Sequence, residues 1–156
     1  MEADNLLKLG WAIAEHEAIA LGAENIEPIH FLLAALKIAD PKFPAQLDKL
    51  DITSEEWKKM SEAARRLRQW LDVLPDHVTD ARRRLRHRLA RNAGPQVTVK
   101  SLHRSRMTKA AFYDASSTSS NDGVLTLRQV IESMFYLGFV NVSDMRWLGD
   151  TKTVQK

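Results

Sequence analysis

Cysteine is absent from the sequence, and residues that interrupt helices are scarce, with six glycines and five prolines among 156 residues. The lack of cysteine excludes disulfides and cysteine-ligated metal sites and fits a reducing compartment. No apolar run reaches the roughly 18 residues of a membrane-spanning helix. The first residues also lack the basic-then-apolar layout of a signal peptide. We therefore expect a cytoplasmic chain with no membrane partner.

Motifs that carry catalysis are missing as well. No glycine belongs to a Gly-x-x-x-x-Gly-Lys-Ser/Thr phosphate loop, and no serine stands in a Gly-x-Ser-x-Gly turn. The five histidines include no pair four residues apart, so no helix carries the histidine pair of a zinc site. His30, at the start of a predicted helix, is expected to pack near the core. The sequence predicts no enzyme, no metal and no cofactor.

Acidic residues are missing from one long segment. Between Arg82 and Lys109 there are ten Lys and Arg and no Asp or Glu, although the net charge of the whole chain is only +3. The other residues therefore carry 13 basic against 20 acidic side chains and are net acidic. This asymmetry indicates one basic segment on an otherwise acidic chain.

Helical patterns account for most of what is present. Apolar residues at helical spacing predict helices over 6–21, 28–38, 53–71 and 78–91, with a short helix near 45–50. Asp4 or Asn5 is available to cap the first helix, and Gly22 suits its end. Pro28 suits the first turn of the next helix. Thr53 and Glu56 form a capping-box pattern.

The second half of the chain repeats this pattern. After a Gly-Pro linker at 92–96, residues 102–116 and 124–137 correspond to the first two helices when Val124 is placed over Ile26 and Thr126 over Pro28. We predict an all-α fold built from a tandem pseudo-repeat of a four-helix unit, about eight helices in total. The predicted domain spans 1–148, with repeats at 5–72 and 101–148 and an arginine-rich insertion at 78–92. Residues 149–156 are interpreted as a polar tail or linker.

The first repeat also resembles a known family. Ala-Leu-Gly, three residues, Ile-Glu-Pro-Ile-His and then Phe-Leu-Leu-Ala-Ala-Leu is similar to the first repeat of the amino-terminal domain of Clp unfoldases, which are AAA+ chaperones. The resemblance implies a non-catalytic binding module for protein substrates, an adaptor or a partner helix. It also implies an AAA+ ATPase module, in cis or in trans.

The resemblance implies recognition in apolar grooves between helices. Five apolar residues are the candidate contacts: Leu6, Leu7, Trp11, Ile29 and Leu127. Trp70 and Trp147 are further candidates, and core packing is the alternative for each of these side chains. Clp domains that bind phosphoarginine carry an acid just before the motif histidine in each repeat. Ile29 and Leu127 occupy those positions here, and Arg128 takes the second histidine position, so we predict no phosphoarginine recognition.

A second hypothesis places function on the basic helix. Its candidate residues for an anionic partner are Arg82, Arg83, Arg86, Arg88 and Arg91. The partner would be nucleic acid, which we do not favour, or an acidic protein. An arginine-rich helix with a narrow apolar stripe is more often a solvated face held by acidic neighbours. Under either interpretation, changing Arg83 and Arg86 to Glu is expected to leave the fold intact.

Overall fold

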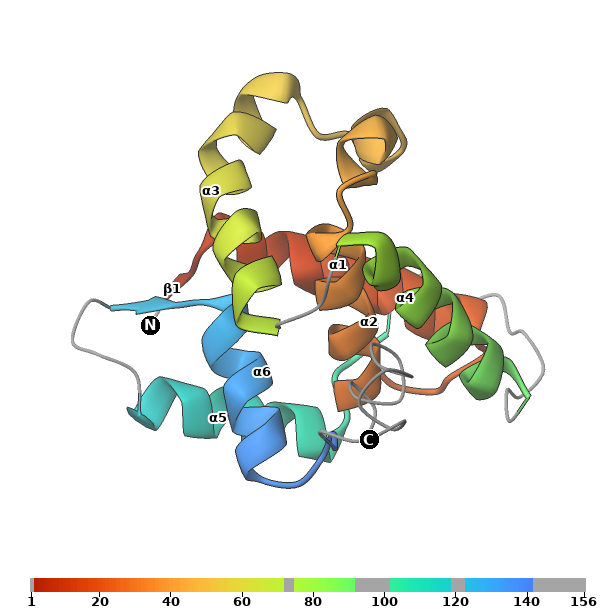
Figure 1. Ribbon diagram of the computed structural model, residues 1–156. Coiled ribbons are helices and arrows are strands. Elements are labelled where there is room, and N and C mark those ends of the chain that lie inside the picture. Colours follow the sequence, from red (N-terminus) through yellow and green to blue (C-terminus); the bar gives the residue numbers. More distant parts are fainter. Residues whose placement is uncertain (1, 72–74, 92–101, 119–122, 142–156) are drawn as a thin grey trace, which may run out of the picture.

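The chain is mostly helical in the computed structural model, which describes residues 2–71, 75–91, 102–118 and 123–141 (Figure 1). This confirms the predicted all-α class. The helices are α1 (Asn5–Ala20), α2 (Pro28–Ala39), the 3-10 helix η1 (Phe43–Leu50), α3 (Ser54–Leu71), α4 (Pro75–Ala90), α5 (Arg106–Thr118) and α6 (Leu127–Tyr136). Two short strands, β1 (Glu2–Ala3) and β2 (Val124–Leu125), pair in parallel.

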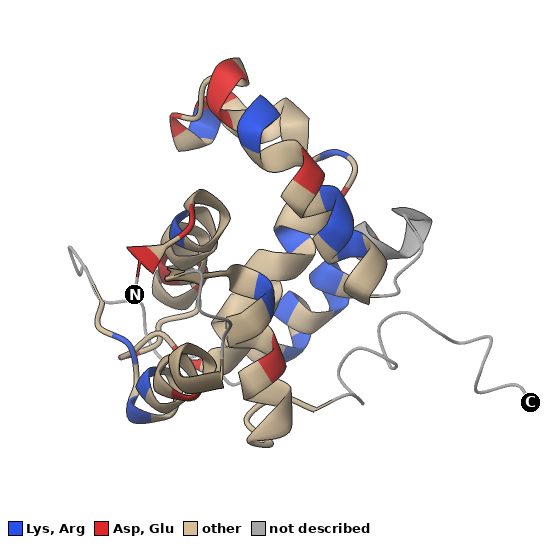
Figure 2. Cartoon of the chain, turned by 90° about the vertical axis from the view of Figure 1, so that its left-hand side faces the viewer, with Lys and Arg blue, Asp and Glu red and all other residues tan. Residues whose placement is uncertain are grey.

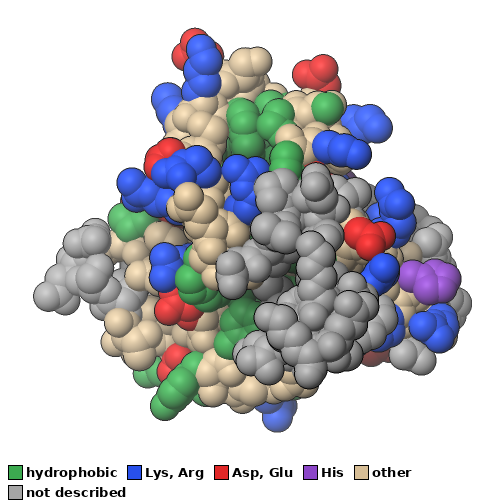
Figure 3. All heavy atoms as spheres, viewed as in Figure 1, with side chains coloured by type: hydrophobic (Ala, Val, Ile, Leu, Met, Phe, Trp, Pro, Cys, Tyr) green, Lys and Arg blue, Asp and Glu red, His purple; other side chains and the backbone are tan. Residues whose placement is uncertain are grey.

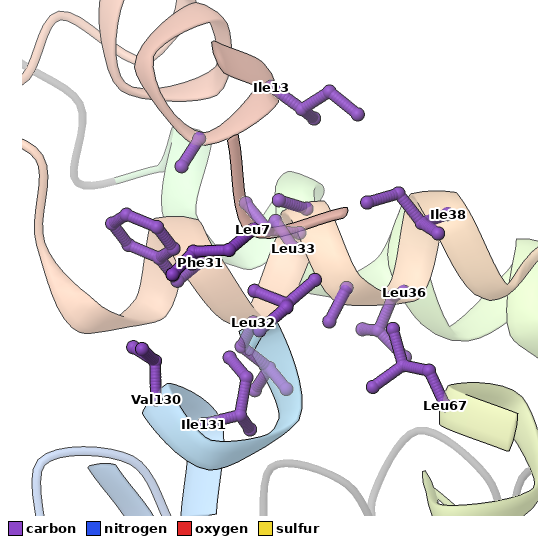
Figure 4. Close-up of a cluster of buried hydrophobic side chains, with 14 of the residues drawn as sticks. Leu7, Ile13, Phe31, Leu32, Leu33, Leu36, Ile38, Leu67, Val130 and Ile131 are labelled. Carbon is purple, nitrogen blue, oxygen red and sulfur yellow. The ribbon is translucent and has the colours of Figure 1, made fainter. Parts of the chain in front are cut away.

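Helix α2 lies at the centre of the core. Six consecutive residues of this helix, from Phe31 to Leu36, have no exposed surface. Leu32 lies close to Val130 and Ile131 of α6, and Leu36 lies close to Leu67 of α3 (Figure 4). A helix that is apolar around most of its circumference is stable only when neighbours surround it. The other elements are therefore arranged around α2.

The predicted ends of the first helices are confirmed. Asp4 Oδ1 accepts a hydrogen bond from the Leu7 amide at 2.8 Å, which caps α1. Gly22 adopts a φ of 69° just after α1, a conformation that favours glycine. Thr53 and Glu56 exchange the two hydrogen bonds of a capping box, at 3.1 and 3.0 Å. Capping side chains and turn residues thus set these boundaries as the sequence predicts.

Two short backbone pairings join the two halves of the chain. Ala3, just before the cap of α1, pairs with Leu125, just before the cap of α6. Arg104, two residues before α5, pairs with Ile26, two residues before α2. The amides of Asp4 and Ser105 donate to Leu125 and Ile26 respectively, each at 3.0 Å. Each half therefore pairs the chain before its first helix with the chain before the second helix of the other half.

The second half differs in detail from the prediction. Helix α5 begins at Arg106 rather than near 102, and α6 begins at Leu127 because Val124 and Leu125 form a strand. Thr126 is the N-cap of α6, as Glu27 is of α2, so placing Thr126 over Pro28 was wrong by one residue. The predicted short helix at 45–50 begins earlier, at Phe43, as a 3-10 helix. The predicted linker at 92–96 and the tail at 149–156 lie outside the described residues.

Candidate functional site

Three of the five predicted protein-binding residues lie in the core. Leu6, Leu7 and Leu127 are at most 5% exposed, so the prediction that they contribute to a binding surface is wrong. Leu127 packs on Gly10 of α1, where an added Cβ would stand 3.1 Å from the leucine side chain. Strand β2 and the cap residue Thr126 lead directly into α6 at Leu127, which has no exposed surface. These residues belong to the apolar sides of α1 and α6, and the apolar side of a helix is the side that packs into the core.

The other predicted contacts keep some exposed surface. Ile29 and Trp11 are partly buried and pack on the edge of the core. The Trp11 ring meets the Phe112 ring edge to face, with their centroids 5.1 Å apart. Trp70 packs similarly against Phe135, at 6.3 Å, and Trp147 lies outside the described residues. Trp11 and Trp70 are therefore the predicted contacts that combine aromatic character with partial exposure.

Trp11 lines a groove of about 400 Å³, which we call the Trp11 groove. The groove receives side chains from α1, from α5 and from the paired strands β1 and β2, so both halves of the chain build it. Its lining residues are Ala3, Trp11, Arg104, Lys109, Phe112, Tyr113, Ser116 and Leu125. Its volume falls in the range of sites that hold a small ligand or a few side chains.

Arg104 covers the aromatic wall of the Trp11 groove. Its guanidinium carbon lies 4.5 Å from the centre of the Trp11 ring and 4.7 Å from that of Phe112. In such a contact the positive guanidinium is attracted by the negative face of the aromatic ring. Burial lowers the pKa of Arg104 from its ordinary value, because water is partly excluded from the charge. The groove therefore combines two aromatic rings with a fixed positive charge.

The sequence interpretation missed Phe112, Arg104 and Tyr113 as site residues. A signal for Phe112 exists, because it stands seven residues after Ser105 just as Trp11 stands seven residues after the cap residue Asp4. Ser105 accepts a hydrogen bond from the Thr108 amide at 3.2 Å, which matches the bond at Asp4. Counting from the caps would have placed the two aromatic residues at equivalent positions.

A second hollow lies between α3 and η1, where hydrophobic side chains gather near the top of the view in Figure 3. It has a volume of about 290 Å³. Trp57 and Pro44 contribute apolar surface, and Glu62, Arg65 and Arg68 contribute charge. Glu62 is paired with Arg65 and lies 3.3 Å from Arg66, so its charge is already balanced within α3. This hollow is smaller and more polar than the Trp11 groove.

Helix α4 is not a free basic surface. Arg86 Nε lies 3.0 Å from Glu17 Oε2, and the Glu17 side chain is almost fully buried. Burial lowers the pKa of Arg82, while the nearby Asp40 and Glu17 carboxylates act in the opposite direction. Arg83 and Arg91 are exposed and Arg88 is partly buried. Arg86 therefore neutralises an acid of α1, and Arg82 lies close enough to Asp40 and Glu17 for their carboxylates to favour its charged form.

Basic residues are spread over several elements rather than gathered on one (Figure 2). Arg65, Arg66 and Arg68 lie on α3, and Arg106 and Lys109 lie on α5, outside the arginine-rich helix. Several of these side chains are paired locally, as in Arg128 with Glu132 at 2.9 Å. The basic segment of the sequence therefore supplies only part of the Lys and Arg on the described helices.

His30 caps a helix. Its Nδ1 accepts a hydrogen bond from the Glu27 amide at 2.8 Å, so the proton of the neutral ring resides on Nε2. Burial lowers the pKa of His30 to about 4. Within the part of the chain that the structure describes, no three His, Asp or Glu side chains gather as metal ligands. None of the helices described there has the length and apolar character needed to cross a membrane.

Comparison with protein-family models, curated proteins and solved structures gives no match for this chain. The geometry of the Trp11 groove and the arrangement of the helices therefore carry the functional argument.

Proposed function

We propose that this chain is a non-catalytic protein-binding module similar to the amino-terminal domain of Clp unfoldases. In this proposal it docks a segment of a protein substrate, an adaptor or a partner helix in the Trp11 groove. The docked protein would be passed to an AAA+ ATPase module, present in cis or in trans. The observation that carries the proposal is the Trp11 groove itself, which has aromatic walls, partial exposure and contributions from both halves of the chain.

The two backbone pairings support the tandem-repeat part of the proposal. In each pairing, the segment before the first helix of one half lies beside the segment before the second helix of the other half: Ala3 beside Leu125, and Arg104 beside Ile26. Two copies of one unit would make such reciprocal pairings. The capping boxes add a second correspondence. Glu27 with His30 and Thr126 with Gln129 stand at the same place in α2 and α6. Repeated units that cannot bury their apolar faces alone are stabilised by packing against each other.

The corrected correspondence leaves one sequence prediction in place. With Gln129 in the position of His30, the residue before it is Arg128 rather than Leu127. Neither Ile29 nor Arg128 is acidic, so the carboxylates that would pair with a modified guanidinium are missing at both positions. We keep the prediction that the chain does not recognise phosphoarginine.

The anionic-partner alternative is less well supported. Arg86 is held by a buried carboxylate and Arg82 is partly buried near Asp40 and Glu17. Binding of a nucleic acid needs several Lys or Arg side chains that can contact phosphates. An arginine that is paired with a buried carboxylate would have to break that ion pair first. Of the five arginines predicted for this role, Arg83, Arg86 and Arg91 are exposed, and Arg86 is already paired with Glu17. We therefore favour peptide docking over binding of an anionic polymer on α4.

A display selection tests the proposal. A library of random dodecapeptides would be selected against the wild-type chain, and the enriched peptides would be measured against two variants. Tyr113→Asp alters the exposed rim of the Trp11 groove, where Tyr113 is 77% exposed. Tyr136→Asp is the matched control, because Tyr136 is 82% exposed at the end of α6 and does not line the groove.

We expect enriched peptides that bind the wild type and Tyr136→Asp alike and bind Tyr113→Asp at least about tenfold more weakly, since a carboxylate in an apolar contact is costly. A selection that enriches no peptide would contradict the protein-binding function. Peptides that bind all three chains equally would contradict the assignment to the Trp11 groove.

A further inference from the structure

The charge of the Trp11 groove restricts what can occupy it. Among its lining residues Arg104 and Lys109 are cationic and none is acidic. Within the described residues, neither side chain makes an ion pair or a hydrogen bond with an acid. Most exposed cations on α3, by comparison, have a carboxylate one helical turn away. The groove therefore presents two positive charges without an internal counter-charge.

The position of Arg104 leaves its hydrogen-bond donors available. A guanidinium is planar, and its N–H groups point outward in that plane. The guanidinium carbon of Arg104 lies over the rings of Trp11 and Phe112, at 4.5 and 4.7 Å from their centres, and these ring contacts do not occupy the N–H groups. An arginine held in this way is well suited to bind a carboxylate through two parallel hydrogen bonds. The aromatic rings restrict its motion, so less conformational entropy is lost when the carboxylate binds.

Apart from Ser116, whose hydroxyl donates to the Phe112 carbonyl at 2.9 Å, the rest of the groove is mainly apolar. Trp11, Phe112, Leu125 and Ala3 form the apolar surface, and Tyr113 stands at the rim. A volume of about 400 Å³ accommodates a few side chains rather than a folded domain. The donors come from long side chains, whereas capture of a chain end typically uses successive backbone amides. These features favour the interior of an extended segment over a terminal carboxylate.

The same features disfavour a nucleotide base as the occupant. Base recognition needs an aromatic face on which the base can stack. Arg104 already covers Trp11 and Phe112, and Phe31 meets Phe112 edge to face with centroids 5.3 Å apart. Of the three rings that line the groove, Tyr113 is the exposed one. One free ring beside two cations fits a carboxylate with an apolar neighbour better than a run of bases.

We infer that the Trp11 groove binds a partner segment in which an internal Asp or Glu adjoins an aromatic or aliphatic residue. The carboxylate accepts hydrogen bonds from the Arg104 guanidinium, Lys109 adds a second positive charge, and the apolar side chain packs beside Phe112 and Tyr113. This inference rests on the proposed protein-binding function and specifies the chemistry of the partner.

The display selection gives the first test, because its peptides are joined to the coat protein and have no free carboxyl end. We expect the enriched dodecapeptides to contain Asp or Glu next to an apolar residue more often than the starting library does. Enriched peptides without this acidic signature would overturn the inference while leaving the proposed function in place. Failure to enrich any peptide would overturn both.

Binding measurements then test the role of Arg104. The strongest acidic peptide would be made with a fluorescein label and an amidated C-terminus, alongside a twin in which Asp and Glu are replaced by Asn and Gln. Fluorescence anisotropy would compare the wild type with Arg104→Gln, with Lys109→Gln and with the control Arg66→Gln, an exposed arginine on α3. Thermal unfolding of each variant would show that it is folded.

We expect the twin to bind the wild type roughly tenfold or more weakly than the acidic peptide, as loss of a charged hydrogen-bonded contact predicts. Arg104→Gln should reduce binding of the acidic peptide to a similar extent and change binding of the twin little, whereas Arg66→Gln should change neither. Lys109→Gln, at an exposed position, should give a smaller loss in the same direction.

Three results would overturn the inference. The first is equal binding of the acidic peptide and its twin. The second is equal binding of the acidic peptide by the wild type, Arg104→Gln and Lys109→Gln. The third is displacement of the peptide by a single-stranded thymidine oligonucleotide whose own binding is lost in Arg104→Gln, which would assign the groove to nucleic acid.

Discussion

His30 is the residue for which structure and chemistry give the sharpest expectation. Its neutral ring accepts the hydrogen bond that caps α2, and protonation of Nδ1 would remove that acceptor. The pKa of His30 in the folded chain is about 4, below the 6.5 of an unperturbed histidine. The unfolded state therefore binds more protons than the folded state between these values. The free energy of unfolding must then fall as the pH is lowered through this window.

We predict that lowering the pH from 7 to 5 costs the wild type about 2 kcal/mol of unfolding free energy through His30, since each pKa unit of the shift corresponds to about 1.4 kcal/mol. In His30→Gln this loss should largely disappear. Glutamine can keep the cap, because Gln129 Oε1 accepts from the Thr126 amide at 2.9 Å in the corresponding place on α6. Urea unfolding of both chains at the two pH values measures the difference.

His30→Ala is the control for this prediction. It removes the titrating ring and the cap together, so it should lower stability at pH 7 as well, by about 1 kcal/mol or more. Burial raises the pKa of Asp4 above its ordinary 3.8, so the folded state binds more protons there than the unfolded state and Asp4 does not cause a loss of stability on acidification. If the wild type and His30→Gln lose the same stability on acidification, another group is responsible.

At the residue scale the sequence predicted environments better than roles. The continuous apolar run of α2 correctly indicated burial, and the assignment of His30 to the edge of the core was correct. The role of His30 as a cap acceptor was missed, because Glu27 does not suggest a capping box until the backbone of the helix start is known. Arg104 was counted only as one cation of a basic segment. Its contact with Trp11 joins residues 93 positions apart, which no local pattern indicates.

At the scale of elements, the attachment of α4 to the core changes an expectation. The sequence suggested that Arg83 and Arg86 could both be reversed without harm. In the structure the partly exposed Arg86 pairs with the buried Glu17, whereas Arg83 is exposed. A carboxylate at position 86 would place a second negative charge beside the buried Glu17 carboxylate. Reversal of Arg86 therefore acts on the contact between α4 and α1, and reversal of Arg83 does not.

We predict that Arg86→Glu lowers the free energy of unfolding by about 1–3 kcal/mol, less than for a fully buried pair because water screens the exposed side of Arg86. Arg83→Glu should change stability by no more than about 0.5 kcal/mol, as expected for exposed surface positions. Chemical denaturation of the two single variants tests this. Equal stability of both variants would show that the ion pair contributes nothing to the docking of α4.

Elements with strong local signals were predicted, and elements defined by distant partners were not. Helices α1, α2 and α3 carry caps, turn residues and apolar stripes, so their limits were correct within about two residues. Strands β1 and β2 have two residues each, too few for an alternating pattern. They form because β1 lies beside the segment that leads into α6. The same pairing shortened α6 relative to its prediction.

The whole molecule depends on contact between its two halves. Four residues of α6, namely Leu127, Val130, Ile131 and Met134, have no exposed surface. Burial of one such side chain contributes about 1.5–3 kcal/mol, and the four together are comparable to the 5–15 kcal/mol by which a domain is typically stable. The sequence predicted a helix in this region, and the repeat to which this helix was assigned stays a prediction. The sequence did not predict the register, because a one-residue offset becomes evident only when the caps of α2 and α6 are compared.

We predict that a fragment of residues 1–91 does not fold cooperatively by itself. Without α6, the face of α2 that contains Leu32 would be exposed to water, and β1 would lack its partner strand. Circular dichroism of the fragment should show reduced helix content and a broad, shallow thermal transition, whereas the full chain should unfold in one sharp step. Addition of an equal amount of a fragment of residues 92–156 should restore helix content, because the core between α2 and α6 can form across two chains.

A sharp transition and dispersed amide resonances for residues 1–91 alone would instead show that the first half is an independent domain. The Trp11 groove would then lie between two domains, because Trp11 belongs to the first half and Arg104 and Phe112 to the second.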